Sequence, residues 1–83
     1  MKFNEVTEMQ LGQRVRVEYI EDLVAYQNND RNRPVIIHPA GTVYEGVIFD
    51  IYSTEDSFSI VDDDGKQWGF SLPNNKLLVT LVW

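Results

Sequence analysis

The feature that most constrains the fold is a strict alternation of apolar and polar side chains. In segment 14–19, Val15, Val17 and Tyr19 alternate with charged residues. Successive side chains of a β-strand point to opposite faces, so this pattern predicts a strand with one buried face. Alternation, or enrichment in β-branched and aromatic residues, predicts further strands over 45–52, 58–61, 67–72 and 76–83.

In segment 45–52 the alternation also predicts which side chains lie together. One face is expected to carry Val47, Phe49 and Ile51, and the other Ile48, Asp50 and Tyr52. Helix signals are limited to one turn each in 4–10, capped by Asn4 or Thr7, and in 20–27, capped by Asp22. The sequence therefore predicts a mainly β protein with at most short helical turns.

The connections between the predicted strands differ in length. A long irregular stretch, 21–41, follows the first strand, and within it Pro34 and Pro39 bracket an extended edge piece. The dipeptide Asp64-Gly65 lies between two alternating segments, which is the strongest short-range signal for a β-hairpin. A meander of strands with one long first loop is therefore expected.

One domain accounts for all 83 residues, because a chain of this length has no room for a second core. We predict a single domain over 1–83 with its core in 11–83, and we expect Trp83 to cap that core. There is no cysteine, which excludes disulfides, thiol nucleophiles and cysteine-ligated metals. No apolar leader or membrane-length apolar run occurs, so a cytoplasmic location is expected.

The charge is acidic and unevenly distributed. The net charge is −6, and residues 45–83 contain seven acidic but only two basic residues. Such a surface repels nucleic acid and anionic lipid and attracts basic protein surfaces. The alternative interpretation is that the acidic residues serve solubility alone.

The order of predicted elements resembles the SH3-like small β-barrel. In this resemblance, 21–41 is the RT-type loop, 53–56 the short loop after the second strand, 62–67 the distal hairpin and 71–78 the bend into the fifth strand. The resemblance covers 11–83 and implies a five-stranded barrel with a long first loop. Stand-alone barrels of this type occur in bacteria and phages, and related KOW- or Tudor-like modules exist. An OB-like sheet is the alternative fold.

Three consecutive aspartates, Asp62, Asp63 and Asp64, allow three interpretations. A calcium loop has oxygen ligands at alternate positions and ends on a bidentate glutamate, and neither feature is present. A hairpin tip needs only a positive-φ pair at Asp64-Gly65, with Asp62 and Asp63 in solvent discouraging edge pairing. We therefore predict a hairpin tip, with partner contact as the alternative and with no metal or cofactor.

No catalytic arrangement is expected. His38 is the only histidine, and nothing in the spacing places it beside a serine as a nucleophile–base pair. The acidic pairs lie on predicted loops, and a small barrel filled by its own side chains leaves little room for a substrate. We predict that the protein is not an enzyme and that His38 is a partly buried loop residue.

Aromatic residues and arginines are the side chains that anchor protein interfaces. Near the predicted long loop and the acidic hairpin, the candidate partner-binding residues are Tyr26, Arg31, Arg33, Tyr44, Tyr52, Asp62, Asp63 and Asp64. The leading prediction is a non-enzymatic acidic binding module, a small regulator or inhibitor of a partner protein with a basic surface. A sharper version is mimicry of nucleic acid by the carboxylates. The competing interpretation makes each tyrosine a half-buried rim residue.

Two alternative functions follow from other features of the chain. A nucleic-acid-binding barrel would stack bases on Tyr26 or Tyr44. Its phosphate contacts would come from the basic residues of the first strand and long loop, Arg14, Arg16, Arg31 and Arg33. A structural subunit of a phage or multiprotein complex would pair its exposed strand edges with neighbours, and a homodimer fits the same exposed edges.

Overall fold

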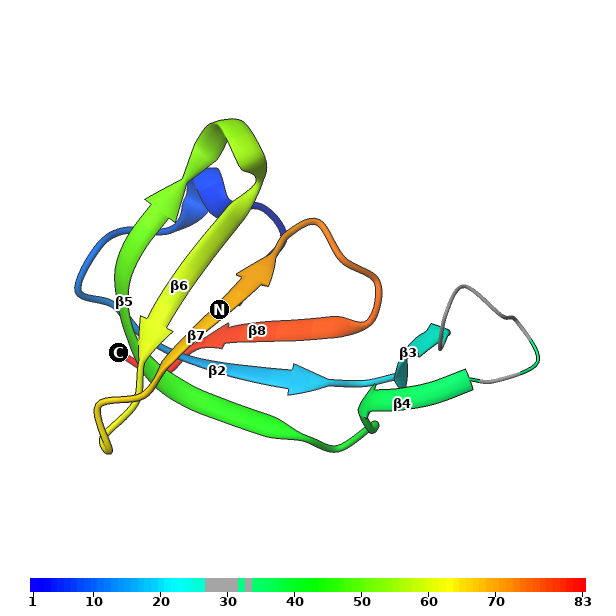
Figure 1. The fold of residues 1–83 in the computed structure, drawn as a ribbon. Coiled ribbons are helices and arrows are strands. Elements are labelled where there is room, and N and C mark those ends of the chain that lie inside the picture. The colour runs from blue at the N-terminus through cyan, green and yellow to red at the C-terminus, as the bar shows by residue number, and fades with distance from the viewer. Residues whose placement is uncertain (27–31, 33) are drawn as a thin grey trace.

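The computed structural model describes residues 1–26, 32 and 34–83 and shows two antiparallel sheets (Figure 1). The strands are β1 (Lys2–Phe3), β2 (Arg14–Tyr19), β3 (Leu23–Tyr26), β4 (Pro34–His38), β5 (Val43–Tyr52), β6 (Ser57–Val61), β7 (Gln67–Ser71) and β8 (Leu77–Leu81). Two 3-10 turns, η1 (Val6–Glu8) and η3 (Ser53–Glu55), are the only helical elements in these residues. The prediction of a mainly β protein with short helical turns is confirmed.

The main sheet has six strands in the order β1-β8-β2-β5-β6-β7, and β3 pairs only with β4. Figure 1 shows the sheet bent, with β6 and β7 lying across β2 and β8. Within the described part of the chain, β1 and β7 remain edge strands, so the sheet is open and is not a closed barrel. The five-stranded SH3-like barrel stays a prediction.

The core lies inside this bend and comes from both halves of the sheet. Val15 and Val17 of β2, Phe58 and Ile60 of β6 and Val79 of β8 are completely buried. The alternation that predicted β2 is confirmed, since its buried and more exposed positions follow period two. Burial of these apolar side chains is the main stabilising contribution to a domain of this size.

The predicted faces of β5 are wrong beyond its middle, because the strand contains a bulge. The pairing with β6 passes from Ile48 to Asp50 while β6 advances by one residue, so Phe49 is the extra residue. A bulge moves the following side chains to the opposite face. Ile48 is buried before the bulge, and Ile51 packs against the same core after it, whereas Phe49 is 40% exposed.

The stretch 21–41 contains a β-hairpin rather than an irregular loop. A helical turn capped by Asp22 was expected, and this expectation is wrong because Leu23–Tyr26 is extended and pairs with β4. Asp22 accepts a hydrogen bond from the backbone N–H of Ala40 at 2.7 Å and so ties the two ends of the hairpin together. The prediction of an extended edge piece between the two prolines is confirmed by β4.

The C-terminal residue does not cap the core. Trp83 is 69% exposed, so the core-capping prediction is wrong. Its carbonyl accepts a hydrogen bond from the N–H of Arg14 at 2.9 Å, and the N–H of Val82 donates to the Arg14 carbonyl. The chain end therefore continues the pairing of β8 with β2 and leaves the indole in solvent.

Candidate functional site

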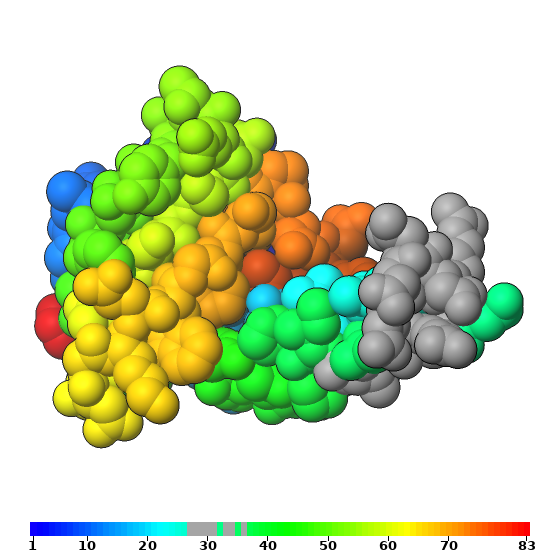
Figure 2. Space-filling model, in the orientation of Figure 1, coloured from blue at the N-terminus to red at the C-terminus, as the bar shows by residue number. Residues whose placement is uncertain are grey.

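A pocket of about 320 Å³ lies beside β7 on the open side of the main sheet. Its lining contains no charged residue and consists of Tyr19, Leu23, Ser57, Phe58, Ser59, Gly69, Phe70, Ser71, Asn74 and Leu77. Figure 2 views this side of the molecule, where the orange surface of β7 adjoins a hollow bordered by cyan and red-orange atoms from other parts of the chain. The pocket therefore lies between the two parts of the bent sheet, at the place where β7 and β8 are not paired with each other.

The pocket takes in residues from both faces of β7. Phe70 is buried and points inward, whereas Gly69 and Ser71 lie at the exposed positions on either side of it. A lining of this composition places the pocket along the free edge of the strand. Its apolar floor is made by Tyr19, Phe70 and Leu77, each less than a tenth exposed.

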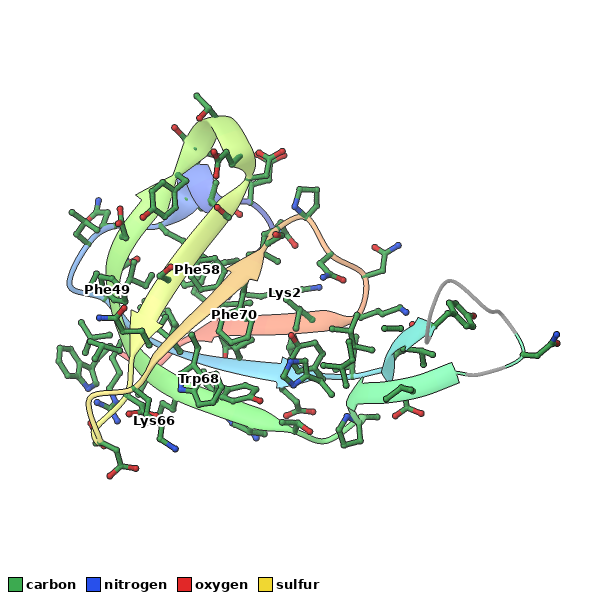
Figure 3. All side chains as sticks on the ribbon, viewed as in Figure 1. Lys2, Phe49, Phe58, Lys66, Trp68 and Phe70 are labelled. Atoms are coloured by element: carbon green, nitrogen blue, oxygen red, sulfur yellow. The ribbon has the colours of Figure 1, made fainter. Side chains whose placement is uncertain are left out.

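An aromatic cluster extends the floor of the pocket across the sheet. Tyr44 packs on Trp68 with ring centroids 4.5 Å apart and on Phe70 with centroids 5.6 Å apart. Phe70 in turn contacts Phe58 at 5.6 Å and Tyr19 at 6.3 Å. Figure 3 shows Phe58, Trp68 and Phe70 together on the inner side of the bend. Tilted ring pairs of this kind stabilise a rigid apolar surface.

His38 joins this cluster from β4. Its ring stacks on Tyr19 with centroids 4.7 Å apart, and its Nδ1 lies 3.1 Å from the hydroxyl of Tyr44. The loop placement predicted for His38 is wrong, because it ends a strand, but its partial burial is confirmed. Burial raises the pKa of Tyr19 above its ordinary value. Through its contacts with Tyr19 and Tyr44, His38 links the hairpin of β3 and β4 to the main sheet.

The three aspartates form the hairpin tip that the sequence predicted. The N–H of Gly65 donates to the Asp62 carbonyl, the N–H of Asp62 donates to the Lys66 carbonyl, and within the tip 62–66 only Gly65 has positive φ. This is a type I turn followed by a glycine bulge. The predicted positive-φ pair at Asp64-Gly65 is therefore wrong, because Asp64 keeps negative φ and the extra residue completes the turn.

Asp62 is a structural residue and is not simply solvated. Its carboxylate accepts hydrogen bonds from the N–H groups of Asp64 and Lys66, both at 2.9 Å, and from Nε1 of Trp68 at 3.0 Å. The hydrogen bond from Trp68 is the largest cause of its lowered pKa. The prediction that Asp62 stays in solvent is wrong, since the carboxylate fixes both the turn and the indole.

Arg14 attaches the same hairpin to the centre of the sheet. Its guanidinium forms two parallel hydrogen bonds of 3.1 Å with the Asp63 carboxylate and one of 2.9 Å from Nε to Glu45. The pKa of Arg14 is raised and that of Asp63 is lowered, chiefly by these hydrogen bonds. Bidentate pairing of this kind fixes the geometry as well as the charge.

These ion pairs bear directly on the nucleic-acid alternative. Arg14 is held by two carboxylates, and Arg16 pairs with Glu18 at 3.1 Å. Phosphate contacts from either side chain would compete with its intramolecular partners. The other two basic residues of that alternative, Arg31 and Arg33, lie outside the described residues.

The predicted tyrosines do not form one surface. Tyr44 belongs to the aromatic cluster, Tyr26 is 48% exposed at the end of β3, and Tyr52 is 45% exposed at the far end of β5. The hydroxyl of Tyr52 donates to Asp50 at 2.5 Å, which is the main cause of its raised pKa. Tyr44 and Tyr52 are eight positions apart in β5, which is about 26 Å measured along the strand at 3.3 Å per residue.

The residues that build the pocket were not singled out from the sequence. Gly69 and Ser71 are small exposed positions in a strand, and such positions carry no chemical signature of their own. The available signal was the small, uncharged side of β6 and β7, where Ser57 faces Ser71 and Ser59 faces Gly69. Alternation identifies the buried face of a strand, but not which sheet edge stays unpaired.

Comparison of the chain with models of protein families, with curated proteins and with solved structures gave no match. Among the described residues, no helix is both long and apolar enough to span a membrane. In the same part of the chain, no group of three or more histidine or acidic side chains is arranged to hold a metal ion.

Proposed function

We propose that this chain is a small, non-enzymatic, acidic protein-binding module that regulates or inhibits a partner by occupying part of its surface. The observation that carries the proposal is the uncharged pocket at β7 with its floor of aromatic and leucine side chains. Aromatic side chains supply large contact area at low entropic cost. A volume of about 320 Å³ suits one or two inserted side chains of a partner.

The predicted SH3-like architecture is part of the proposal. The five strands expected from the sequence correspond in chain order to β2, β5, β6, β7 and β8, and the hairpin of β3 and β4 occupies the long first loop. This correspondence supports an SH3-like barrel that is open between its last two strands. The cytoplasmic location expected from the sequence also remains a proposal.

The acidic surplus defines the kind of partner. The net charge of −6 favours a basic protein surface over nucleic acid or a second copy of this chain. Among the three aspartates, Asp64 is exposed and its carboxylate has no ion pair in the described structure, whereas Asp62 and Asp63 hold the hairpin. Asp64 is therefore the member of the three best suited to contact a partner.

A matched pair of serine substitutions tests the proposal. Ser71→Arg places a long charged side chain at the pocket, and Ser53→Arg places the same side chain on η3. Tagged wild-type protein and both variants are used to capture partners from a lysate of the native host after nuclease treatment, with mass spectrometry as the readout. We expect one stoichiometric protein with the wild type and Ser53→Arg and its loss with Ser71→Arg.

Two results contradict the proposal. Equal recovery of the partner by Ser71→Arg and Ser53→Arg would remove the pocket from the binding surface. Loss of every captured protein on nuclease treatment would favour the nucleic-acid alternative, which predicts binding that weakens steeply as the salt concentration rises.

A further inference from the structure

We propose that the free edge of β7 binds an extended peptide segment of a partner protein by strand addition, with one apolar side chain of that segment in the adjoining pocket. The inference rests on the proposed protein-binding function and names how the same site works. It follows from the direction of the backbone N–H and C=O groups of β7, from the small side chains along its edge and from the charge around it.

Hydrogen bonds at both ends of β7 determine which of its residues direct their backbone groups to β6. The N–H of Asp62 donates to the Lys66 carbonyl at 2.9 Å, and the N–H of Leu72 donates to the Asp56 carbonyl at 2.9 Å. In an antiparallel ladder, hydrogen-bonded and non-hydrogen-bonded residues alternate. Between Lys66 and Leu72, Trp68 and Phe70 therefore direct their backbone groups to β6.

The other three residues direct their backbone groups away from β6. These residues are Gln67, Gly69 and Ser71. In the described structure β7 has no strand on that side, so three N–H and three C=O groups face outward from one edge. The binding partner with matching geometry is a second extended backbone, which supplies complementary groups at the same two-residue spacing.

The side chains along the edge allow a second backbone to approach. Gly69 has no side chain, Ser71 has a small one, and both are exposed. Natural edge strands are commonly protected by charged side chains, proline, bulges or short length. The segment Gln67–Ser71 has none of these protections, and its ladder with β6 is regular.

The pocket determines the side chain that a bound segment presents. A strand paired at Gly69 points alternate side chains toward the inner side of the sheet. There the pocket offers Tyr19, Phe70 and Leu77 as an apolar floor and Asn74 at its rim. The segment therefore carries an aliphatic or aromatic residue at the position that enters the pocket.

Charge selects the flanks of the segment and disfavours self-pairing. Asp56 is exposed near the Ser71 end of β7, Asp64 and Lys66 are exposed near the Gln67 end, and the chain as a whole carries −6. Two copies that paired through β7 would bring like net charges together, whereas a segment with flanking Lys or Arg would be attracted. The proposed occupant is an extended peptide with basic flanks and an apolar residue between them.

A proline substitution separates backbone pairing from pocket contact. Gly69→Pro removes an N–H that points away from β6, so the ladder with β6 keeps its hydrogen bonds, and proline is tolerated at such edge positions. Gly69→Ala is the matched control, because it keeps the N–H and its Cβ would lie 3.8 Å from the nearest atom, Oγ of Ser59. The probe is a display library of random nine-residue peptides selected against the wild-type protein.

We expect selected peptides to bind the wild type and Gly69→Ala equally and to bind Gly69→Pro at least about tenfold more weakly, because a backbone acceptor of the peptide loses its partner. In the wild type, such a peptide also protects the amides of Gln67, Gly69 and Ser71 from hydrogen exchange. That second measurement applies even if Gly69→Pro does not fold.

The inference is overturned if peptides bind Gly69→Pro as tightly as Gly69→Ala, if bound peptides leave the three edge amides unprotected, or if no peptide is selected. Failure here is distinguishable from failure of the proposed function. A partner that is captured from lysate and lost with Ser71→Arg, but retained with Gly69→Pro, would keep the protein-binding function and reject strand addition.

Discussion

The two edges of the main sheet are built differently. β1 has two residues, and its register with β8, together with the bond from the N–H of Leu81 to the Met1 carbonyl, leaves only Lys2 with outward backbone groups. Lys2 is charged, and charged side chains protect strand edges. β7 has five residues and directs the backbone groups of three of them outward without a charged side chain.

The two edges also adjoin different hollows. The hollow beside β1 has about 240 Å³, includes Lys2 in its lining and is otherwise built around the bend 72–75. The pocket beside β7 is larger and has no charged residue in its lining. The edge at β1 is thus short and protected by the charged Lys2, whereas the edge at β7 has no such protection. This difference identifies β7 as the edge suited to binding.

The largest expected effect comes from removing the core that supports β6 and β7. Phe58 is completely buried, so Phe58→Ala should lower the free energy of unfolding by about 3–5 kcal/mol and abolish binding at β7. Phe49→Ala is the matched control, because Phe49 lies at the bulge and is 40% exposed, and its change should be within about 1 kcal/mol. Urea denaturation measures both values, and similar losses would contradict the assigned bulge.

A pair of glycine substitutions compares an interior strand with the open edge. A Cβ at Gly46 would lie 2.4 Å from the Val61 carbonyl oxygen, so Gly46→Ala forces β5 and β6 apart and should cost about 1–3 kcal/mol. Gly69→Ala meets no atom closer than 3.8 Å and should change stability by less than about 0.5 kcal/mol. Thermal denaturation of the two variants provides the measurement. Equal destabilisation would mean that β7 is as enclosed as β5.

Acid should destabilise the turn 62–66, which connects β6 to β7. The folded-state pKa values of Asp62 and Asp63 are lowered, so their stabilising contribution is present above the unfolded value of about 3.9 and is lost as the pH falls through the lower folded values. Asp62→Asn should reduce this pH dependence, and Asp64→Asn is the control because the Asp64 carboxylate accepts no hydrogen bond in the described structure. Unfolding measured from pH 7 downward tests this, and an unchanged slope for Asp62→Asn would contradict it.

The smallest expected effect on stability comes from giving β7 the protection that β1 has. Gly69→Lys places a charged side chain on the exposed outer side of the edge and should change the free energy of unfolding by less than about 0.5 kcal/mol. It should nevertheless weaken binding of selected basic peptides, through charge and through obstruction of the edge. Binding as tight as that of Gly69→Ala would contradict the comparison between the edges.

The sequence predicted those features that depend on local pattern. The alternation around Val15 and Val17, the hairpin at Gly65 and the mainly β character of the chain were each readable from neighbouring residues. The bulge at Phe49 was not, because an extra residue in one strand shows only against the register of its partner. The hairpin formed by β3 and β4 was missed because short apolar segments suit a helical turn or a strand equally well.

The candidate site was less predictable than the fold because it depends on what is absent from one side of β7. The ion pairs of Arg14 join residues up to 49 positions apart, and this pairing gives the Asp63 carboxylate an intramolecular partner. Trp68 lies six positions from Asp62, and the hydrogen bond from its indole to the Asp62 carboxylate depends on the pairing of β6 with β7. Long-range pairings of this kind have no signature in a single sequence.

The most direct test of the central claim is residue-resolved amide hydrogen exchange along β7 in the free protein, measured by NMR. The account predicts an alternating pattern, with rapid exchange at Gln67, Gly69 and Ser71 and slow exchange at Trp68 and Phe70. Slow exchange at all five residues would show that the edge is already covered, by another part of the chain or by a second copy. That result would contradict an open binding edge at β7.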